Sequence, residues 1–400
     1  MSTPHPFSLG VALDGAGWHP SAWREPSSHP ADLFTAAYWV DLVATAERAT
    51  LDFATIEDSL ALQSERFLVG DERTDEVRGR LDAVLIASRV APSTSRIGLI
   101  PVATVTHTEP FHVSKAIATL DYVSEGRAGV QVKVSARADE AAHVGRRAHP
   151  GDVLVDDPAF RAFVDDAFEE AADAVEVIRR LWDSWEDDAE IRDAATDRFL
   201  DADKVHAIDF EGRFFSVRGP SITPRPPQGQ PVVAALAHAA VPYRLAARAA
   251  DVVFVTPADA VHARAILDEV REAERVVARE GEPLRVIADL VVLIDTPGGE
   301  TGPDRLARLD ALGRPLASDA RIVAGSASTV ADVVDDLAAA GFAGVRLRPG
   351  VATDDLPRIA DDLAPELRRR GLIEPTTRTT LRGRLGLPEG FPSRYATPVA

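Results

Sequence analysis

Short apolar runs alternate with longer amphipathic stretches along most of this chain. The runs are rich in Val, Ile and Ala, which is typical of buried strands, and the stretches between them repeat apolar positions with a helical period. This alternation predicts βαβ units and a parallel sheet, and eight strands with intervening helices favour a closed (β/α)8 TIM barrel. The predicted strands are Leu9–Leu13, Phe53–Glu57, Ile97–Pro101, Ala128–Val132, Val232–Ala235, Val252–Val255, Leu284–Ile294 and Gly344–Leu347. The predicted helices are Leu33–Ala49, Asp82–Val90, Pro110–Val123, Phe160–Trp185, Ala240–Ala249, Ala258–Arg279, Thr329–Ala340 and Asp355–Arg370.

Three stretches interrupt the alternation, namely residues 136–158, 187–230 and 296–321, and a polar tail covers residues 371–400. In a barrel, insertions of this size usually lie on the face that carries the C-terminal ends of the strands, where active sites form. We therefore expect all three insertions to border the site. Because α/β barrels often exceed the usual domain length, we expect residues 1–400 to form one domain.

The composition of the chain argues against several kinds of binding partner and several cellular locations. The formal net charge of −19 argues against nucleic acid or an anionic membrane as a partner. The chain has no cysteine, which excludes disulfides, thiolate nucleophiles and cysteine-ligated metals. No apolar run approaches the ~20 residues that span a bilayer, and Met1–Leu9 lacks the features of a signal peptide. We expect a cytoplasmic protein.

Histidines are the remaining candidates for a metal site. His107, His112 and His143 lie near one another in the sequence, but no His-x-His pair and no His-Glu-x-x-His motif is present. His112 lies on a predicted helix, where a structural role is the simpler interpretation. We therefore predict no metal.

Several segments resemble one branch of a known enzyme family. They are Gly17–Arg24, Ala46–Arg48, Glu57–Leu62, Thr108–Val113, Leu120–Gly129, Leu181–Ala189, Phe214–Pro220, Pro224–Val232 and Leu381–Pro388. Together, and in this order, they resemble the nitrilotriacetate and dibenzothiophene-sulfone monooxygenase branch of the bacterial luciferase-like, flavin-dependent monooxygenase superfamily. The matches span nearly the whole chain.

The resemblance implies a TIM barrel that works as one half of a two-component oxygenase. A separate NAD(P)H-dependent flavin reductase would supply reduced FMN, which reacts with O2 to oxidise a small organic substrate. The flavin carries the chemistry, while the protein positions it and excludes water. Family members of this kind are commonly homodimers or homotetramers, so we expect a homo-oligomer.

The resemblance also suggests cofactor-binding residues. Asp58 follows the second strand, where the family places an acidic flavin contact, and Thr104 follows the third, where it has a small hydroxyl residue. Gln131 takes the place of a family Asn, and Ser135 matches a family Ser. Simpler interpretations exist: Asp58 as a helix cap, and Thr104 and Gln131 as partners of backbone groups. No catalytic residue is identified.

Departures from the family pattern gather where the flavin phosphate would bind. The family's His and Tyr at the start of the helix after the first insertion correspond to Val164 and Phe168. Its Gly-Ser-Ser turn after the fifth strand corresponds to Ala237-His238-Ala239. His238 is the one potential replacement donor, although it is equally consistent with an ordinary exposed histidine. We therefore expect FMN to bind weakly.

Two alternative functions remain open. A deazaflavin-dependent oxidoreductase would need basic residues for a long anionic tail, and Arg146, Arg147 and Arg161 lie in the appropriate part of the sequence. A non-catalytic barrel relative that has lost its hold on the flavin phosphate is the other alternative. The sequence does not identify the substrate.

Overall fold

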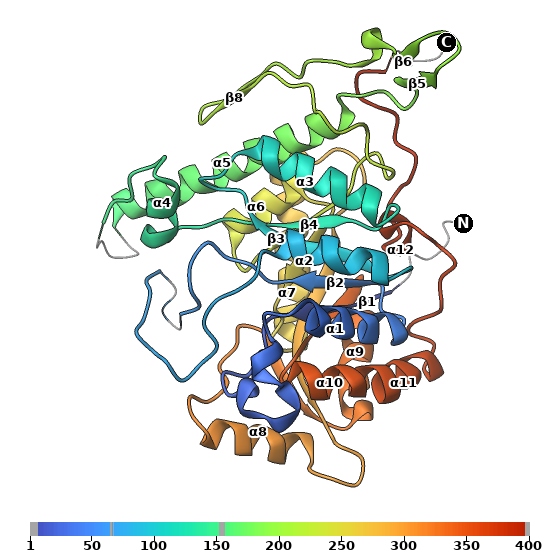
Figure 1. Cartoon of the computed structure of the whole chain (residues 1–400). Coiled ribbons are helices and arrows are strands. Elements are labelled where there is room, and N and C mark those ends of the chain that lie inside the picture. Colours follow the sequence, from blue (N-terminus) through green and yellow to red (C-terminus); the bar gives the residue numbers. More distant parts are fainter. Residues whose placement is uncertain (1–6, 65, 67, 152–156, 397–400) are drawn as a thin grey trace.

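The computed structural model describes residues 7–64, 66, 68–151 and 157–396. Eight parallel strands form a closed barrel, which confirms the predicted TIM architecture (Figure 1). β1 pairs with β2 on one side and with β13 on the other, and pairing of β10 with β11 completes the ring. The barrel strands are β1 (Ser8–Leu13), β2 (Phe53–Ile56), β3 (Gly98–Thr104), β4 (Gly129–Lys133), β9 (Val232–Leu236), β10 (Val252–Val255), β11 (Arg285–Ile294) and β13 (Gly344–Pro349).

Helices surround the barrel and bury its outward-facing side chains in one large apolar cluster (Figure 1). Side-chain caps set several of their N-termini: Thr35, Asp157 and Asp259 each accept a hydrogen bond from a first-turn amide, so these helices begin two to three residues away from the predicted positions. The helices are α1 (Ala36–Arg48), α2 (Ala83–Val90), α3 (Pro110–Val123), α5 (Pro158–Asp183), α6 (Ala240–Ala249), α7 (Ala260–Val276), α9 (Ala327–Ala340), α10 (Ala352–Arg358) and α11 (Ala364–Arg369). No helix in the described residues combines the length and apolar character that crossing a bilayer requires.

Apolar side chains close the N-terminal end of the barrel. Phe53, Phe254 and Ile287 pack there with Leu381 and Leu385, which come from the short helix α12 (Leu381–Arg384) and its end. Gly98 permits this approach, because a Cβ at that position would lie 2.4 Å from the Leu381 side chain. The tail thus seals one end of the barrel, and the opposite end is where the strands present their C-termini.

Two of the three insertions lie where expected. The first follows β4 and contains α4 (Ala138–Val144), and the third follows β11 and contains α8 (Gly302–Ala311), so both start from C-terminal strand ends. The expectation is wrong for the second, which joins α5 to β9 and therefore starts and ends at the N-terminal face. It carries the pairs β5 (Glu190–Asp193) with β6 (Arg198–Leu200), and β7 (Phe210–Glu211) with β8 (Ser216–Val217). The loop between β7 and β8 runs back along α5, where Arg213 pairs with Asp166.

The sheet also contains a strand that the sequence did not predict. β12 (Arg321–Gly325) pairs with Leu290–Ile294 of β11, whereas β10 pairs with Arg285–Ala288 of the same strand. β12 therefore takes the place of β10 as the neighbour of β11 along the C-terminal half of that strand. It extends the wall on the C-terminal side of the barrel.

Candidate active site at the barrel mouth

The C-terminal end of the barrel, called the mouth below, is lined by charged and polar side chains. Alternate residues of a strand face the same side, so the inward position after Phe53 and Thr55 on β2 is Glu57. Inward residues on the other strands follow the same rule. They are Gln131 and Lys133 on β4, Asp289 on β11, and Arg346 and Arg348 on β13.

An ion cluster forms the floor of the mouth. Arg346 donates from Nε and Nη2 to the two carboxylate oxygens of Asp289, at 2.7 and 2.6 Å. Its Nη1 reaches Gln131 Oε1 at 2.6 Å and Thr55 Oγ1 at 3.2 Å, and its guanidinium lies 3.7 Å from the centre of the Phe254 ring. These bonds join four strands inside the barrel. Because Arg346 and Asp289 are fully buried, each depends on the other to offset lost hydration.

A second guanidinium shares the same carboxylate. Arg348 donates to Asp289 from Nη2 and to Asp319 from Nη1, the latter at 2.7 Å. The indole of Trp18 lies over it, with 4.5 Å between the guanidinium carbon and the ring centre. Trp18 itself is held by a 3.0 Å hydrogen bond from its indole nitrogen to the Ala12 carbonyl. The first loop of the chain therefore covers this side of the mouth.

The predicted cofactor residues Asp58 and Ser135 have local backbone partners. Asp58 accepts hydrogen bonds from the amides of Ser59 and Ala83 at 2.7 and 2.9 Å, and so supports the start of α2. Ser135 Oγ accepts from the Arg137 amide at 3.2 Å. Both side chains lie at the C-terminal ends of strands, as expected, but their oxygens are used within the protein.

Thr104 and Gln131 lie closer to the barrel axis. Both are buried, on the adjacent strands β3 and β4. The carbonyl of Thr104 accepts from the Thr108 hydroxyl at 2.8 Å, and Gln131 gives its acceptor oxygen to Arg346. Gln131 is thus part of the ion cluster, and its side-chain amide oxygen accepts the hydrogen bond from Arg346.

Two charged residues of the mouth, Glu57 and Lys133, have few hydrogen-bond partners. Neither was predicted from the sequence as a site residue. The carboxylate of Glu57 accepts no hydrogen bond from the described residues; its nearest cation is Arg346, whose Nη1 lies 3.9 Å away. Burial raises the pKa of Glu57, and the positive charge of Arg346 opposes that rise. Lys133 donates to the Asp58 carbonyl at 3.0 Å, and burial lowers the pKa of its ammonium group. Both residues could have been predicted from the sequence, because each is a charged residue at an inward-facing position of a mainly apolar strand.

His107 lies beside the mouth under the first insertion. Its backbone is left-handed, with φ of 68°, and its ring is buried against Phe163 at a centroid distance of 6.2 Å. Neither ring nitrogen makes a well-formed hydrogen bond to the described residues, and burial lowers the pKa of the ring. A neutral, packed imidazole agrees with a structural role. Among the described residues no group of three His, Asp or Glu side chains is arranged to hold a metal ion.

The region where the resemblance places the flavin phosphate offers few donors among the described residues. Val164 and Phe168 lie on α5 and provide none, and Ala237 and Ala239 flank His238 before α6. The ring of His238 already has two partners, Thr256 Oγ1 at 3.0 Å and Asp319 Oδ2 at 3.3 Å. Burial lowers its pKa, with Asp319 opposing, so that the neutral form is favoured.

Nearby charged side chains do not provide a net positive charge that could bind the phosphate instead. The groove of about 380 Å³ beside Phe168 contains Asp165 and Glu169 as well as Arg244 and Arg248, and their formal charges cancel. The third residue of α6 is Pro242, which has no amide to offer. A phosphate carries close to two negative charges and is normally held by several charge-assisted bonds. The residues present therefore do not fit a tightly held FMN phosphate at this position.

The arginines considered for a deazaflavin tail are engaged elsewhere. Arg146 pairs with Glu109 at 2.9 Å, and Arg147 pairs with Glu170 at 2.7 Å while lying over the Phe214 ring. Arg161 also has an interaction partner. These contacts tie the first insertion to α3, α5 and the β7–β8 loop.

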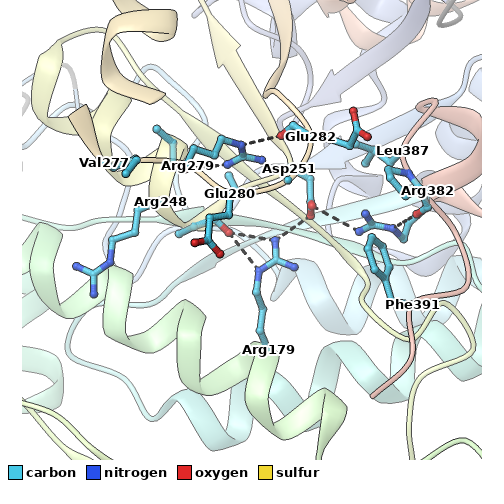
Figure 2. Close-up of a pocket in the computed structure, with 16 residues that line it drawn as sticks. Arg179, Arg248, Asp251, Val277, Arg279, Glu280, Glu282, Arg382, Leu387 and Phe391 are labelled. Atoms are coloured by element: carbon cyan, nitrogen blue, oxygen red, sulfur yellow. Dashed lines mark hydrogen bonds and ion pairs between the residues drawn. The ribbon is translucent and has the colours of Figure 1, made fainter. Parts of the chain in front are cut away.

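A cavity of about 560 Å³ lies at the opposite end of the barrel (Figure 2). Its arginines serve the chain itself: Arg179 and Arg279 donate to the carbonyls of Ala249 and Ala247 at 3.1 and 2.8 Å, at the C-terminal end of α6. Arg382 of α12 binds the Pro388 carbonyl at 2.7 Å and lies over Phe391. Cations at a helix C-terminus stabilise it, so we assign this cavity to attachment of the tail and place the candidate site at the mouth.

Known proteins resemble this chain in sequence and in fold. Residues 16–299 match the model of the luciferase-like monooxygenase family. The chain is 32% identical to N-acetyl-S-(2-succino)cysteine monooxygenase of Bacillus subtilis (strain 168), over 72% of this chain and 61% of that protein. It is also 32% identical to nitrilotriacetate monooxygenase component A of Aminobacter aminovorans, over 74% of this chain and 63% of that protein. The matches thus span less than two thirds of the length of these curated relatives.

A solved structure extends the likeness in fold to nearly the whole chain. EDTA monooxygenase from Chelativorans sp. BNC1 superposes with a TM-score of 0.79 at 24% identity, covering 96% of this chain and 98% of that one. The resemblance drawn from the sequence is confirmed, in family and in branch. The chain belongs to the luciferase-like monooxygenase family.

Proposed function

We propose that this chain is the oxygenase component of a two-component, flavin-dependent monooxygenase. It would use O2 and reduced FMN, delivered by a separate NAD(P)H-dependent reductase, to oxidise a small organic molecule. The observation that carries the proposal is the family match over residues 16–299, which reaches from the loop after β1 to the end of β11. The name of one relative, a monooxygenase component A, supports a second component as partner.

The small number of donors among the described residues of the expected phosphate region would determine how the flavin is used. Val164, Phe168 and the already paired His238 favour brief occupancy, so reduced FMN would act as a diffusing co-substrate rather than a resident group. When bound, the flavin supplies the activation of oxygen. The chain's own contribution is a fixed, polar mouth in which a small substrate is held away from bulk water.

The ion cluster is suited to that task. Arg346, Asp289 and Arg348 hold one another in place before any ligand arrives, so little reorganisation is needed on binding. Trp18 shields one side of this cluster from solvent. Water exclusion strengthens electrostatic interactions between the mouth and a polar substrate.

A non-catalytic barrel is the second candidate, and the same missing donors favour it. Anaerobic calorimetry with oxidised and with reduced FMN separates the two candidates. The oxygenase is expected to bind reduced FMN measurably and to turn over only when reductase, NAD(P)H and O2 are all present. Turnover with NAD(P)H alone would contradict the two-component proposal, and absence of binding by either flavin form would favour the non-catalytic relative.

A further inference from the structure

Glu57 differs from the other carboxylates around the mouth. Asp289 is held by two guanidinium groups, Asp58 by two backbone amides, and Asp14 by Arg80 at 3.1 and 2.7 Å. No described residue donates a comparable hydrogen bond to Glu57, although its side chain is only 18% exposed. Buried carboxylates are normally satisfied by donors. Its oxygens are therefore available to a molecule that enters the mouth.

The position of Glu57 follows from the strand that precedes it. Its amide donates to the Leu13 carbonyl at 3.0 Å, which continues the β1–β2 ladder by one residue. The Thr55 side chain faces the barrel interior, where it accepts from Arg346, so Glu57 faces the same way one step closer to solvent. A packed barrel strand thus fixes the carboxyl group at the mouth.

Charged groups from four directions act on Glu57. Arg346 and Arg348 approach from β13, Lys133 from β4, Asp14 from the end of β1, and Arg80 from the loop before α2. Burial acts against its charged form and raises its pKa, and Asp14 acts in the same direction. Arg346 and Lys133 act in the opposite direction, so the ionised form, once produced, has cations to stabilise it. A carboxyl group in such surroundings resembles a general acid that can both hold and release a proton.

We propose that Glu57 is a catalytic general acid, which donates its proton to an oxygen or nitrogen atom of the substrate bound in the mouth. In this step the O–H bond of the Glu57 carboxyl group breaks and an O–H or N–H bond forms on the substrate. The negative charge left on Glu57 is stabilised by Arg346, 3.9 Å away. The inference rests on the proposed function, because it requires that the substrate binds at this mouth.

Infrared titration of the full-length protein tests whether Glu57 holds a proton. Above the pH at which a free glutamate ionises, the wild type is expected to show a protonated-carboxyl component that is lost in Glu57→Gln and kept in the matched control Asp58→Asn, whose carboxylate supports the start of α2. The difference between the spectra of wild type and variant isolates this component from the buried carboxyl groups of Asp52 and Asp121, whose pKa values burial raises to about 6. Because Gln replaces a neutral acid of the same shape, the variant should fold like the wild type. A Glu57→Gln spectrum that matches the wild type in this region would show that Glu57 is ionised and overturn the proposal, whatever the enzyme does.

Turnover then tests the role in chemistry, with reduced FMN, O2 and two probes that carry oxygen and nitrogen atoms, nitrilotriacetate and N-acetyl-S-(2-succino)cysteine. Glu57→Gln should lower kcat by about 100-fold with little change in KM, and should remove the decline in rate that the wild type shows as pH rises through the Glu57 pKa. Glu57→Asp should recover part of the loss. Rates of Glu57→Gln within about twofold of wild type would contradict the general-acid role and leave the oxygenase assignment intact. No turnover by the wild type would overturn both.

Discussion

Asp289 and Arg346 are directly paired residues on the adjacent strands β11 and β13, and their side chains form a two-bond ion pair inside the barrel at 2.7 and 2.6 Å. The same carboxylate also holds Arg348. A TIM-barrel interior at this level is commonly filled by branched apolar side chains. Here two cations and one anion take their place, so removing the anion would leave the buried Arg346 without its ion-pair partner and Arg348 with Asp319 alone.

Asp289→Asn is therefore expected to destabilise the protein strongly. Breaking a buried pair from one side costs about 3–5 kcal/mol, because the remaining charge has lost both partner and hydration. Urea unfolding of the variant and the wild type measures the difference in free energy of unfolding. Asp332→Asn is the matched control, since Asp332 pairs with Arg370 on the surface and is 69% exposed. A loss below about 1 kcal/mol in Asp289→Asn would mean that the cluster does not stabilise the fold.

Restoring donors at the phosphate region should tighten flavin binding. The triple variant Val164→His, Phe168→Tyr and His238→Ser reintroduces the family's side-chain types, and each new charge-assisted bond is worth roughly 1.5–3 kcal/mol. That corresponds to about one to two powers of ten in Kd for each bond. Calorimetric titration with FMN measures the change, and Phe168→Leu serves as control. Nanomolar binding by the wild type, or an unchanged Kd in the triple variant, would place the phosphate elsewhere.

FMN affinity of the wild type should also depend on pH through His238. The protonated ring can attract a phosphate, but burial lowers its pKa, so the gain is expected only as pH falls below the ordinary histidine range. Calorimetric titrations with FMN between pH 5 and 8 measure this pH dependence of the Kd in the wild type and in His238→Ala. A dependence that survives in His238→Ala would assign the effect to another group.

Glu57 should make stability fall as pH rises. Because its pKa is raised in the folded state, the native protein binds its proton more tightly than the unfolded chain does. The resulting stability is complete below the ordinary pKa of glutamate and is lost as pH rises through the folded value. Glu57→Gln should lack this loss, so the Tm of the variant should exceed that of the wild type increasingly toward neutral pH. Parallel Tm curves for the two proteins would contradict the raised pKa.

We also expect the protein to be a homo-oligomer in solution. Phe34 and Leu62 are 52% and 63% exposed, and Phe34 lies against Gly79, whose amide binds the Gln63 side chain next to Leu62. Exposed apolar side chains on segments that contact one another are typical of contact surfaces. Light scattering should give a multiple of 42.9 kDa, and Phe34→Glu with Leu62→Glu should shift the mass toward the monomer. A wild-type mass of 42.9 kDa would rule out the oligomer.

The barrel strands were predictable because each contains a short run of mainly apolar residues. Leu284–Ile294, for example, agrees with β11 to within one residue. β12 escaped prediction because Arg321–Gly325 is short and follows a polar stretch without a clear period. The placement of the second insertion was wrong because its size, rather than its connection from α5 to β9, was taken as the guide.

The site was harder to predict, since the chemistry of a barrel interior depends on which residues of several strands meet at one level. The resemblance drew attention to Asp58, whose carboxylate supports α2, while the neighbouring Glu57 faces the interior. Gln131 was found, but its partner Arg346 lies 215 residues away in the sequence. Period-two alternation could have placed Glu57, Lys133 and Arg346 inside the barrel, but the strand pairing was needed to bring them together.

The most direct test of the oxygenase proposal is a single turnover with isotopically labelled O2. Protein, chemically reduced FMN and a probe substrate such as nitrilotriacetate are mixed without oxygen, labelled O2 is admitted, and the product is examined by mass spectrometry. The proposal predicts one labelled oxygen atom per product molecule, and no labelled product when protein or reduced FMN is omitted. Product that carries oxygen from water, or that forms equally well without reduced FMN, would contradict it.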